Sequence, residues 1–167
     1  EGYFIIPLGI SIITVIFVLI GERIVPYRAD WAVSSGDELT DALQTFLTLP
    51  VFSKLGEVFI ISAFGYLIYD YWNLKIAFDL TPFGGHALHL VAVIIVSEFF
   101  FYGCHRLFHQ FAVLWKIHTI HHGAKRVYWL NSGRFHFVEA FVTSVFYFTP
   151  FLFFKPYPET VVILISI

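Results

Sequence analysis

The sequence predicts an all-α fold: a multi-pass transmembrane helical bundle with a histidine-rich helical cap on its cytoplasmic face. The first observation is composition, because 58% of the residues are hydrophobic, only 13% are charged and the mean hydropathy is +0.77. Soluble domains carry about a quarter charged residues. The second observation is a series of long apolar runs, and the third is a cluster of histidines between Glu98 and Glu139, which holds six of the eight in the chain.

The apolar runs are long enough to cross a bilayer, which takes about 20 apolar residues in a helix. We expect spans at about residues 3–20, 55–72, 88–104 and 137–154, and the start of a fifth at 160. Asp37–Leu47 has leucines at helical spacing and predicts a separate short amphipathic helix on the membrane surface. The sequence has no Met and ends inside an apolar run, so we expect residues 1–167 to form one membrane domain of a longer protein.

The charges give this arrangement an orientation. Eight of the ten Lys and Arg fall on one face of the predicted membrane domain, and only Lys75 and Lys155 fall on the other. The positive-inside rule places the face with eight cations in the cytoplasm, at a bacterial inner membrane or the endoplasmic reticulum. The histidine cluster is on this face, whereas His86 and His89 are on the opposite one. The net charge of −2 without a basic run does not indicate nucleic-acid binding, and a single Cys excludes an internal disulfide.

The histidine spacing predicts a metal site. His105 and His109 are four residues apart, and His118, His121 and His122 follow at i, i+3 and i+4, so each set lies on one face of a helix. We expect the third span to continue past its apolar part and carry the first pair, and a second helix to carry the triplet. Neutral imidazole suits iron, copper, nickel or zinc. Five nitrogens exceed what one tetrahedral zinc needs, so the count favours two metals.

Four further residues are candidates for the same site. His136 lies at the start of the fourth predicted span and is a candidate ligand, with Glu139 on the same helix face as its carboxylate partner or as a residue that favours the helix N-terminus. Glu98 lies two helical turns before His105 and could accept the outer N–H of a ligating imidazole. Asn131 is either a ligand through water or a loop cap.

Three strings in this stretch form a specific pattern: EFFFYGCHRLFH, LWKIHTIHH and NSGRFHFVE. Together they resemble the fatty acid hydroxylase/sterol desaturase superfamily of integral membrane di-iron oxygenases. The resemblance covers residues 98–139, the histidine-motif core. Glu98 stands where an aspartate is more usual in that family, and Gly103 stands where a bulky residue is more common. The family also has further histidines beyond this region, which residues 1–167 do not include.

The resemblance implies a site with two non-haem iron ions that uses O2 to hydroxylate or desaturate a lipid drawn from the bilayer, such as a fatty acyl chain or a sterol. Electrons would come from an external donor such as a cytochrome b5-, ferredoxin- or reductase-type protein. The metal ligands that it implies are His105, His109, His118, His121, His122 and His136. The residues expected to support these ligands are Glu98, Asn131 and Glu139.

Three alternatives to this function remain open at the level of sequence. A metal transporter would line a path through its spans with histidines, whereas these histidines lie at the ends of spans. A membrane b-type cytochrome would need paired axial histidines on facing helices, which adjacent His121 and His122 fit poorly. An inactive relative is the third alternative. The motifs specify neither the lipid nor the choice between hydroxylation and desaturation.

Overall fold

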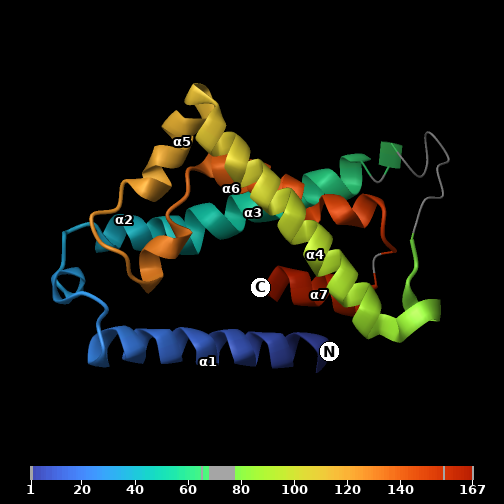
Figure 1. The fold of residues 1–167 in the computed structure, drawn as a ribbon, viewed down its shortest axis with the longest axis horizontal. Helices are drawn as coiled ribbons and strands as arrows, with labels where there is room; N and C mark the ends of the chain where they lie inside the picture. The colour runs from blue at the N-terminus through green and yellow to red at the C-terminus, as the bar shows by residue number, and fades with distance from the viewer. Residues whose placement is uncertain (1, 65, 68–77, 156, 167) are drawn as a thin grey trace.

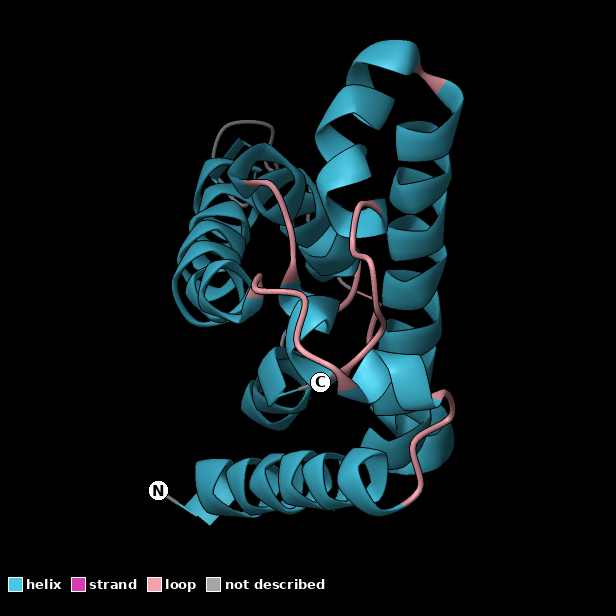
Figure 2. Ribbon diagram, turned by 90° about the vertical axis from the view of Figure 1, so that its left-hand side faces the viewer, coloured by secondary structure: helices cyan, strands magenta, loops and turns pink. Residues whose placement is uncertain are grey.

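The computed structural model describes residues 2–64, 66–67, 78–155 and 157–166, and over these residues the protein is all-helical. Figure 1 shows the order of the helices, and Figure 2 shows the loops that connect them. The α-helices are α1 (Gly2–Ile24), α2 (Glu38–Leu43), α3 (Leu49–Phe59), α4 (Thr81–Gln110), α5 (Ala112–His122), α6 (Phe137–Phe148) and α7 (Pro158–Ser166). Short 3-10 helices are η1 (Ala29–Ala32), η5 (Trp129–Gly133) and η6 (Thr149–Leu152), and π-helical turns are η2 (Gln44–Thr48) and η3 (Ile60–Phe64).

The helix that begins at Glu38 continues without a break to Phe64. The sequence instead predicted a separate surface helix over 37–47 and a span that begins at residue 55. The physical reason lies at Pro50, which cannot donate a backbone hydrogen bond and crowds the preceding turn. The chain widens into the π-helical turn η2 immediately before Pro50, and this widening accommodates the proline inside one continuous run.

Two helical runs in the described part of the chain are long and apolar enough to cross a membrane, Glu38–Ala63 and Thr81–Gln110. Helix α1 covers the first predicted span, and α6 with η6 covers most of the fourth. Helix α7 begins where the fifth span was expected. The last part of the second predicted span, residues 68–72, lies outside the described residues.

Helices α3 and α6 pack closely, and this packing sets the position of the helix that carries Glu139. A Cβ atom at Gly56 would lie 2.5 Å from the carbonyl oxygen of Phe141, so only glycine permits this approach. The hydroxyl of Ser144 donates to the carbonyl oxygen of Ser53 at 2.6 Å across the same contact. The two backbones are therefore held at a fixed separation.

Helix α4 crosses α6 obliquely (Figure 1). Its regular part follows a kink at Gly84 and Gly85, where Gly85 has φ of 69°, a conformation that side chains other than glycine rarely adopt. Beyond the kink it runs unbroken to Gln110. The buried apolar side chains beside this crossing form the main core, made of Ile60, Val93, Phe148, Phe151, Leu152 and Leu164.

Candidate metal centre

The end of α4 and all of α5 carry the clustered histidines. Helix α4 continues past its apolar part as predicted and presents His105 and His109 near its C-terminal end. At Phe111 the backbone becomes extended, with φ −102° and ψ 124°, and α5 then turns back from α4 (Figure 1). This single break in helical conformation brings the two histidine faces together.

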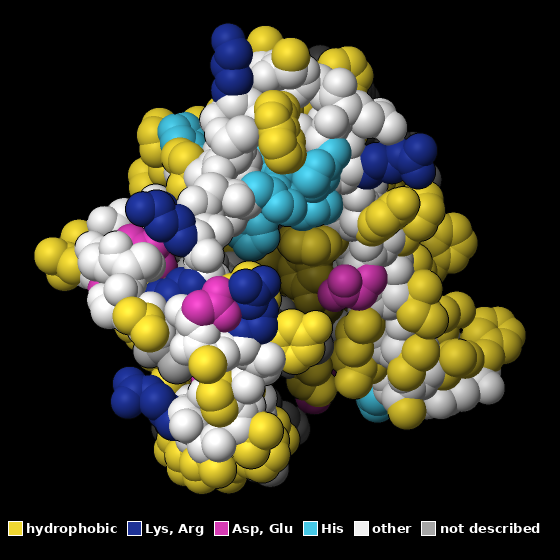
Figure 3. Space-filling model, turned by 60° about the vertical axis from the view of Figure 1, so that its left-hand side comes forward, with side chains coloured by type: hydrophobic (Ala, Val, Ile, Leu, Met, Phe, Trp, Pro, Cys, Tyr) yellow, Lys and Arg dark blue, Asp and Glu magenta, His cyan; other side chains and the backbone are white. Residues whose placement is uncertain are grey.

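Four imidazole rings converge at this turn: those of His105, His109, His118 and His122. The Nε2 atom of His109 lies 3.1 Å from Nε2 of His105 and 3.2 Å from Nε2 of His118. Nε2 of His122 lies 3.0 Å from Nε2 of His118. The candidate ligand atoms of all four lie within 4.8 Å of one another. Figure 3 shows histidine side chains gathered in a hollow of one face, with hydrophobic side chains beneath them.

These distances fit imidazoles that share one metal ion. Two nitrogens that bind one ion at right angles, each at about 2.1 Å, are separated by about 3.0 Å. The shortest separations here are 3.0, 3.1 and 3.2 Å. Nε2 of His118 also faces two other imidazole nitrogens at once, and a cation between them would satisfy all three lone pairs. The four histidines are therefore a group that could hold a metal ion.

A buried carboxylate orients the central ring of this group. Nδ1 of His118 lies 2.5 Å from Oε1 of Glu139, and the two side chains are 0% and 1% exposed. Because Nδ1 is engaged with the carboxylate, Nε2 is the nitrogen that faces the other histidines. Burial lowers the pKa of His118 to about 4, so the ring enters the group in its neutral, metal-binding form.

The other two predicted ligands lie outside the group of four. The ring of His121 stacks on Phe135, with ring centroids 4.8 Å apart, and its buried Nδ1 has no hydrogen-bond partner among the described residues. Burial lowers the pKa of His121 as well. His136 is the N-cap of α6, where its Nδ1 accepts the backbone N–H of Val138 at 3.2 Å.

The remaining predicted site residues have different surroundings. Glu98 is exposed on α4, and no hydrogen bond joins it to a histidine within the described ranges. Asn131 is buried, and its amide group donates to the carbonyl oxygen of Arg126 and accepts the N–H of Tyr128 at 3.2 Å. The structure thus places Asn131 in the loop-cap role, one of the two that the sequence left open.

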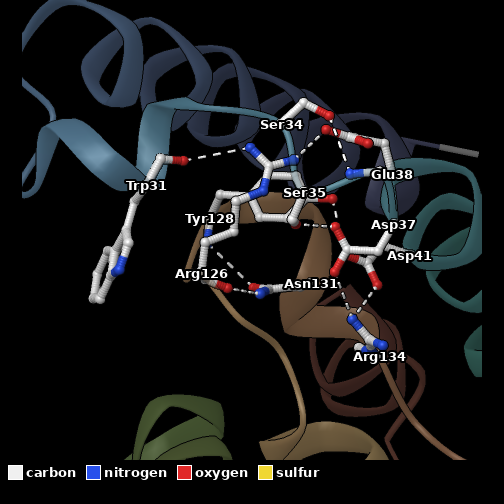
Figure 4. Close-up of polar contacts among 11 residues, drawn as sticks. Trp31, Ser34, Ser35, Asp37, Glu38, Asp41, Arg126, Tyr128, Asn131 and Arg134 are labelled. Atoms are coloured by element: carbon white, nitrogen blue, oxygen red, sulfur yellow. Dashed lines mark hydrogen bonds and ion pairs between the residues drawn. The ribbon is translucent and has the colours of Figure 1, made fainter.

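A polar network that the sequence analysis missed ties the segment after α5 to the start of α2 (Figure 4). Arg134 binds Asp37 at 3.0 Å and the fully buried Asp41 at 3.1 Å. Arg126 binds Glu38 at 2.5 Å, and its guanidinium also donates to the carbonyl oxygen of Trp31. The available signal was charge complementarity, since Asp37–Asp41 is rich in acidic residues and the histidine segment contains none between its flanking glutamates.

A tyrosine completes this network. The hydroxyl of Tyr128 donates to Asp41 at 2.8 Å, and burial raises the pKa of Tyr128 to about 12. The guanidinium of Arg126 lies over the Tyr128 ring, 4.0 Å from its centroid. The chain on both sides of η5 is therefore anchored on α2, and this anchoring limits the positions open to α5 and α6.

Comparison with known proteins finds a matching family and a curated relative. Residues 90–167 match the family described as fatty acid hydroxylase. The chain is 30% identical over 134 residues to the ornithine lipid hydroxylase OlsE of Rhizobium tropici, a match that covers 75% of this chain and 38% of that protein. The chain thus spans less than half the length of this curated relative. No solved structure matches it.

Proposed function

The chain belongs to the fatty acid hydroxylase family through residues 90–167, and from this we propose that the whole protein is a membrane-bound non-haem di-iron oxygenase that oxidises a lipid. The observation that carries the proposal is that the candidate ligand atoms of four histidines lie within 4.8 Å of one another, with three Nε2–Nε2 separations of 3.0, 3.1 and 3.2 Å. The reaction would be hydroxylation or desaturation of a fatty acyl chain, a sterol or a related lipid. The relative is named as a hydroxylase of ornithine lipid, which supports a membrane lipid as substrate.

The iron ligands in this proposal come from α4, α5 and the start of α6. The four converging histidines would hold one iron, and His121 and His136 would be ligands of a second iron. Bound iron would supply the oxidising power, together with O2, that amino-acid side chains lack for attack on an unactivated C–H bond. The groups that would hold it are all imidazole nitrogens, and the carboxylate of Glu139 supports one of these rings from behind.

The side chains around the group have separate roles. Glu139 holds the proton on Nδ1 of His118 and so fixes the tautomer and the direction of Nε2. The ring of Trp115 lies 5.2 Å from that of His109 and 5.6 Å from that of His122, and it shields this side of the group from water. Phe108 is buried against His118, with ring centroids 5.6 Å apart.

The membrane part of the proposal is supported by exposed apolar side chains. Val91, Ile95 and Phe99 follow at intervals of four along one face of α4 and are 51%, 62% and 70% exposed. Only 22% of the apolar window of α4 is buried, whereas the core helix of a soluble protein would be mostly buried. We propose that residues 1–167 form one multi-pass membrane domain, with the histidines on its cytoplasmic face. Exposed His109 and His122 would there be accessible to an electron-donor protein.

The ring separations argue against a b-type cytochrome. Two axial nitrogens on opposite sides of one haem iron are about 4 Å apart, with the porphyrin between them. Here the Nε2 atoms of neighbouring rings are only 3.1 Å (His105 and His109), 3.2 Å (His109 and His118) and 3.0 Å (His118 and His122) apart. A porphyrin does not fit between rings in such contact.

The test is turnover by the full-length, iron-loaded protein with a chemical or protein reductant, a lipid extract and isotopically labelled O2. Mass spectrometry should find either one labelled oxygen atom added to a lipid or two hydrogen atoms removed from it. The His118→Ala protein is the negative control. A fully loaded, reducible protein that changes no lipid would overturn the proposed activity.

A further inference from the structure

A cavity of about 670 Å³ lies between the C-terminal end of α1, the segment that follows it and the segment after α5. Ligand pockets in proteins typically have volumes of about 300–1,000 Å³, so a small polar group with its linker would fit. The lining residues are Leu19, Glu22, Arg23, Val25, Pro26, Tyr27, Arg28, Trp31, Ser34, Glu38 and 126–130.

The cavity presents one unpaired charge of each sign. Arg28 is paired with Asp30, and Arg126 with Glu38. Glu22 and Arg23, by contrast, form no ion pair with any residue that the structure describes. Adjacent residues of opposite charge on one cavity wall favour a ligand that itself carries both charges.

One buried polar atom beside the cavity lacks a partner. Arg126 is 8% exposed, and its Nε–H is buried with no hydrogen-bond partner among the described residues, although its terminal nitrogens are engaged. Leaving such a donor unsatisfied is costly, and the guanidinium that carries it adds positive charge beside the cavity.

Aromatic rings complete the lining: Tyr27, Trp31, Tyr128 and Trp129. Tyr27 and Trp31 are in contact, with ring centroids 5.8 Å apart. Arg28 lies over the ring of Trp31 and Arg126 over that of Tyr128, so Tyr27 and Trp129 are the lining rings left to attract an organic ammonium group. Trp and Tyr are also enriched where a membrane meets water.

We propose that this cavity binds the zwitterionic headgroup of a membrane lipid, with its anionic group toward Arg23 and Arg126 and its ammonium group toward Glu22 and the rings of Tyr27 and Trp129. The cavity lies at the end of an apolar helix, where lipid headgroups are located. The headgroup would enter from the bilayer while its acyl chains stay in the hydrocarbon region.

The position of the cavity relates it to the histidine group. Arg126 follows His122 by four residues, so their Cα atoms are at most about 14 Å apart. A lipid anchored by its headgroup would therefore place the first part of its chains within reach of the metal centre. That this lipid is the substrate rests on the proposed function, whereas the binding of its headgroup does not.

The test measures lipid binding by the full-length, metal-free protein in detergent, using native mass spectrometry or quenching of tryptophan fluorescence. Three lipids with identical acyl chains are compared: phosphatidylethanolamine, phosphatidylglycerol and diacylglycerol. The zwitterionic lipid should bind most tightly, and Arg23→Gln or Glu22→Gln should each weaken its binding about tenfold, since each removes one charged contact. Lys125→Gln is the matched control, because Lys125 is an exposed cation next to Arg126 that does not line the cavity.

Several results would overturn the proposal. Tighter binding of phosphatidylglycerol would show general attraction of anionic lipids, and equal loss in the Lys125→Gln protein would show the same. Displacement of the lipid by millimolar inorganic phosphate would identify a phosphate site. Binding that neither cavity substitution alters would remove the cavity from lipid recognition. Because no iron or turnover is involved, a failure here leaves the proposed activity untouched, and a failure of activity leaves headgroup binding untouched.

Discussion

Nδ1 of His118 lies 2.5 Å from Oε1 of Glu139, and both side chains are buried. The contact joins α5 to α6, so a residue on a third helix controls how α5 presents its imidazole to the histidines of α4. The other carboxylate oxygen, Oε2, is buried without a hydrogen-bond partner among the described residues. A charged group in such a position is retained at a cost, and orientation of a metal ligand is a physical reason for it.

The first prediction concerns this carboxylate. Glu139→Gln should weaken metal affinity about 10–100-fold, because the amide keeps the shape of the side chain but removes the charge that orients His118. Affinity is measured by competition with a chelator of known strength. Glu98→Gln is the matched control, since Glu98 is an exposed carboxylate on α4. Equal losses in the two proteins would contradict a specific role for Glu139.

Single histidine substitutions should have different effects on metal content, depending on whether the histidine binds the first iron, binds the second iron or lies outside the site. His118→Ala should abolish metal retention, because Nε2 of His118 contacts two of the other three rings. His121→Ala should lower the iron content by about one ion per chain, as expected for a ligand of a second iron. His86→Ala should retain all metal, because His86 is far along α4 and packs edge-on against Tyr157. Full metal content in the His118→Ala protein would contradict the assignment of His118 as a metal ligand.

The network around Arg134 should contribute to stability. Arg134→Gln leaves the buried carboxylate of Asp41 without its cation and should lower the free energy of unfolding by about 3 kcal/mol. Adding Asp41→Asn should restore part of the loss, which a double-mutant cycle measures by thermal unfolding in detergent. Arg28→Gln removes an exposed pair with Asp30 and should leave the melting temperature unchanged. Additive effects at Arg134 and Asp41 would show that the pair is not coupled.

Acid should weaken the contact that joins the start of α4 to the segment before α7. Hydrogen bonds from Thr81, Tyr157 and Lys155 hold the pKa of the Asp79 carboxyl well below its usual range. A carboxyl with a lowered folded-state pKa stabilises the protein fully above its unfolded value of about 3.9, and this stabilisation is lost as the pH falls.

The measurement is the melting temperature from about pH 7 to about pH 3 for the natural protein and for Asp79→Asn. The natural protein should be the more stable of the two at neutral pH, and the difference should shrink toward the acid end. A difference that stays constant with pH would contradict this role for Asp79.

The sequence predicted the histidine convergence because its signal is local. Residues at i and i+4 share a helix face whatever the rest of the fold does, and only one turn at Phe111 was needed to join the two faces. The helical content followed in the same way from the apolar runs. The break expected between Leu47 and residue 55 is absent, because a π-helical turn accommodates Pro50 where the pattern indicated separate helices.

Contacts between distant segments could not be predicted. The sequence suggested Glu139 as a supporting carboxylate beside His136, but which histidine it contacts depends on how α6 packs against α3 and α5. The pairing of Arg134 with Asp37 and Asp41 spans more than 90 residues and has no spacing rule. The N-cap role of His136 depends on where α6 begins, and helix ends are set by the local backbone.

The central claim is that these histidines help to hold two non-haem irons. The most direct measurement is the metal content of the full-length protein, purified in detergent from iron-replete cells, together with its optical spectrum. We predict about two irons per chain without a Soret band, and a loss of iron in the His118→Ala protein. A Soret band, or a protein that holds only zinc or no metal after iron loading, would contradict the claim.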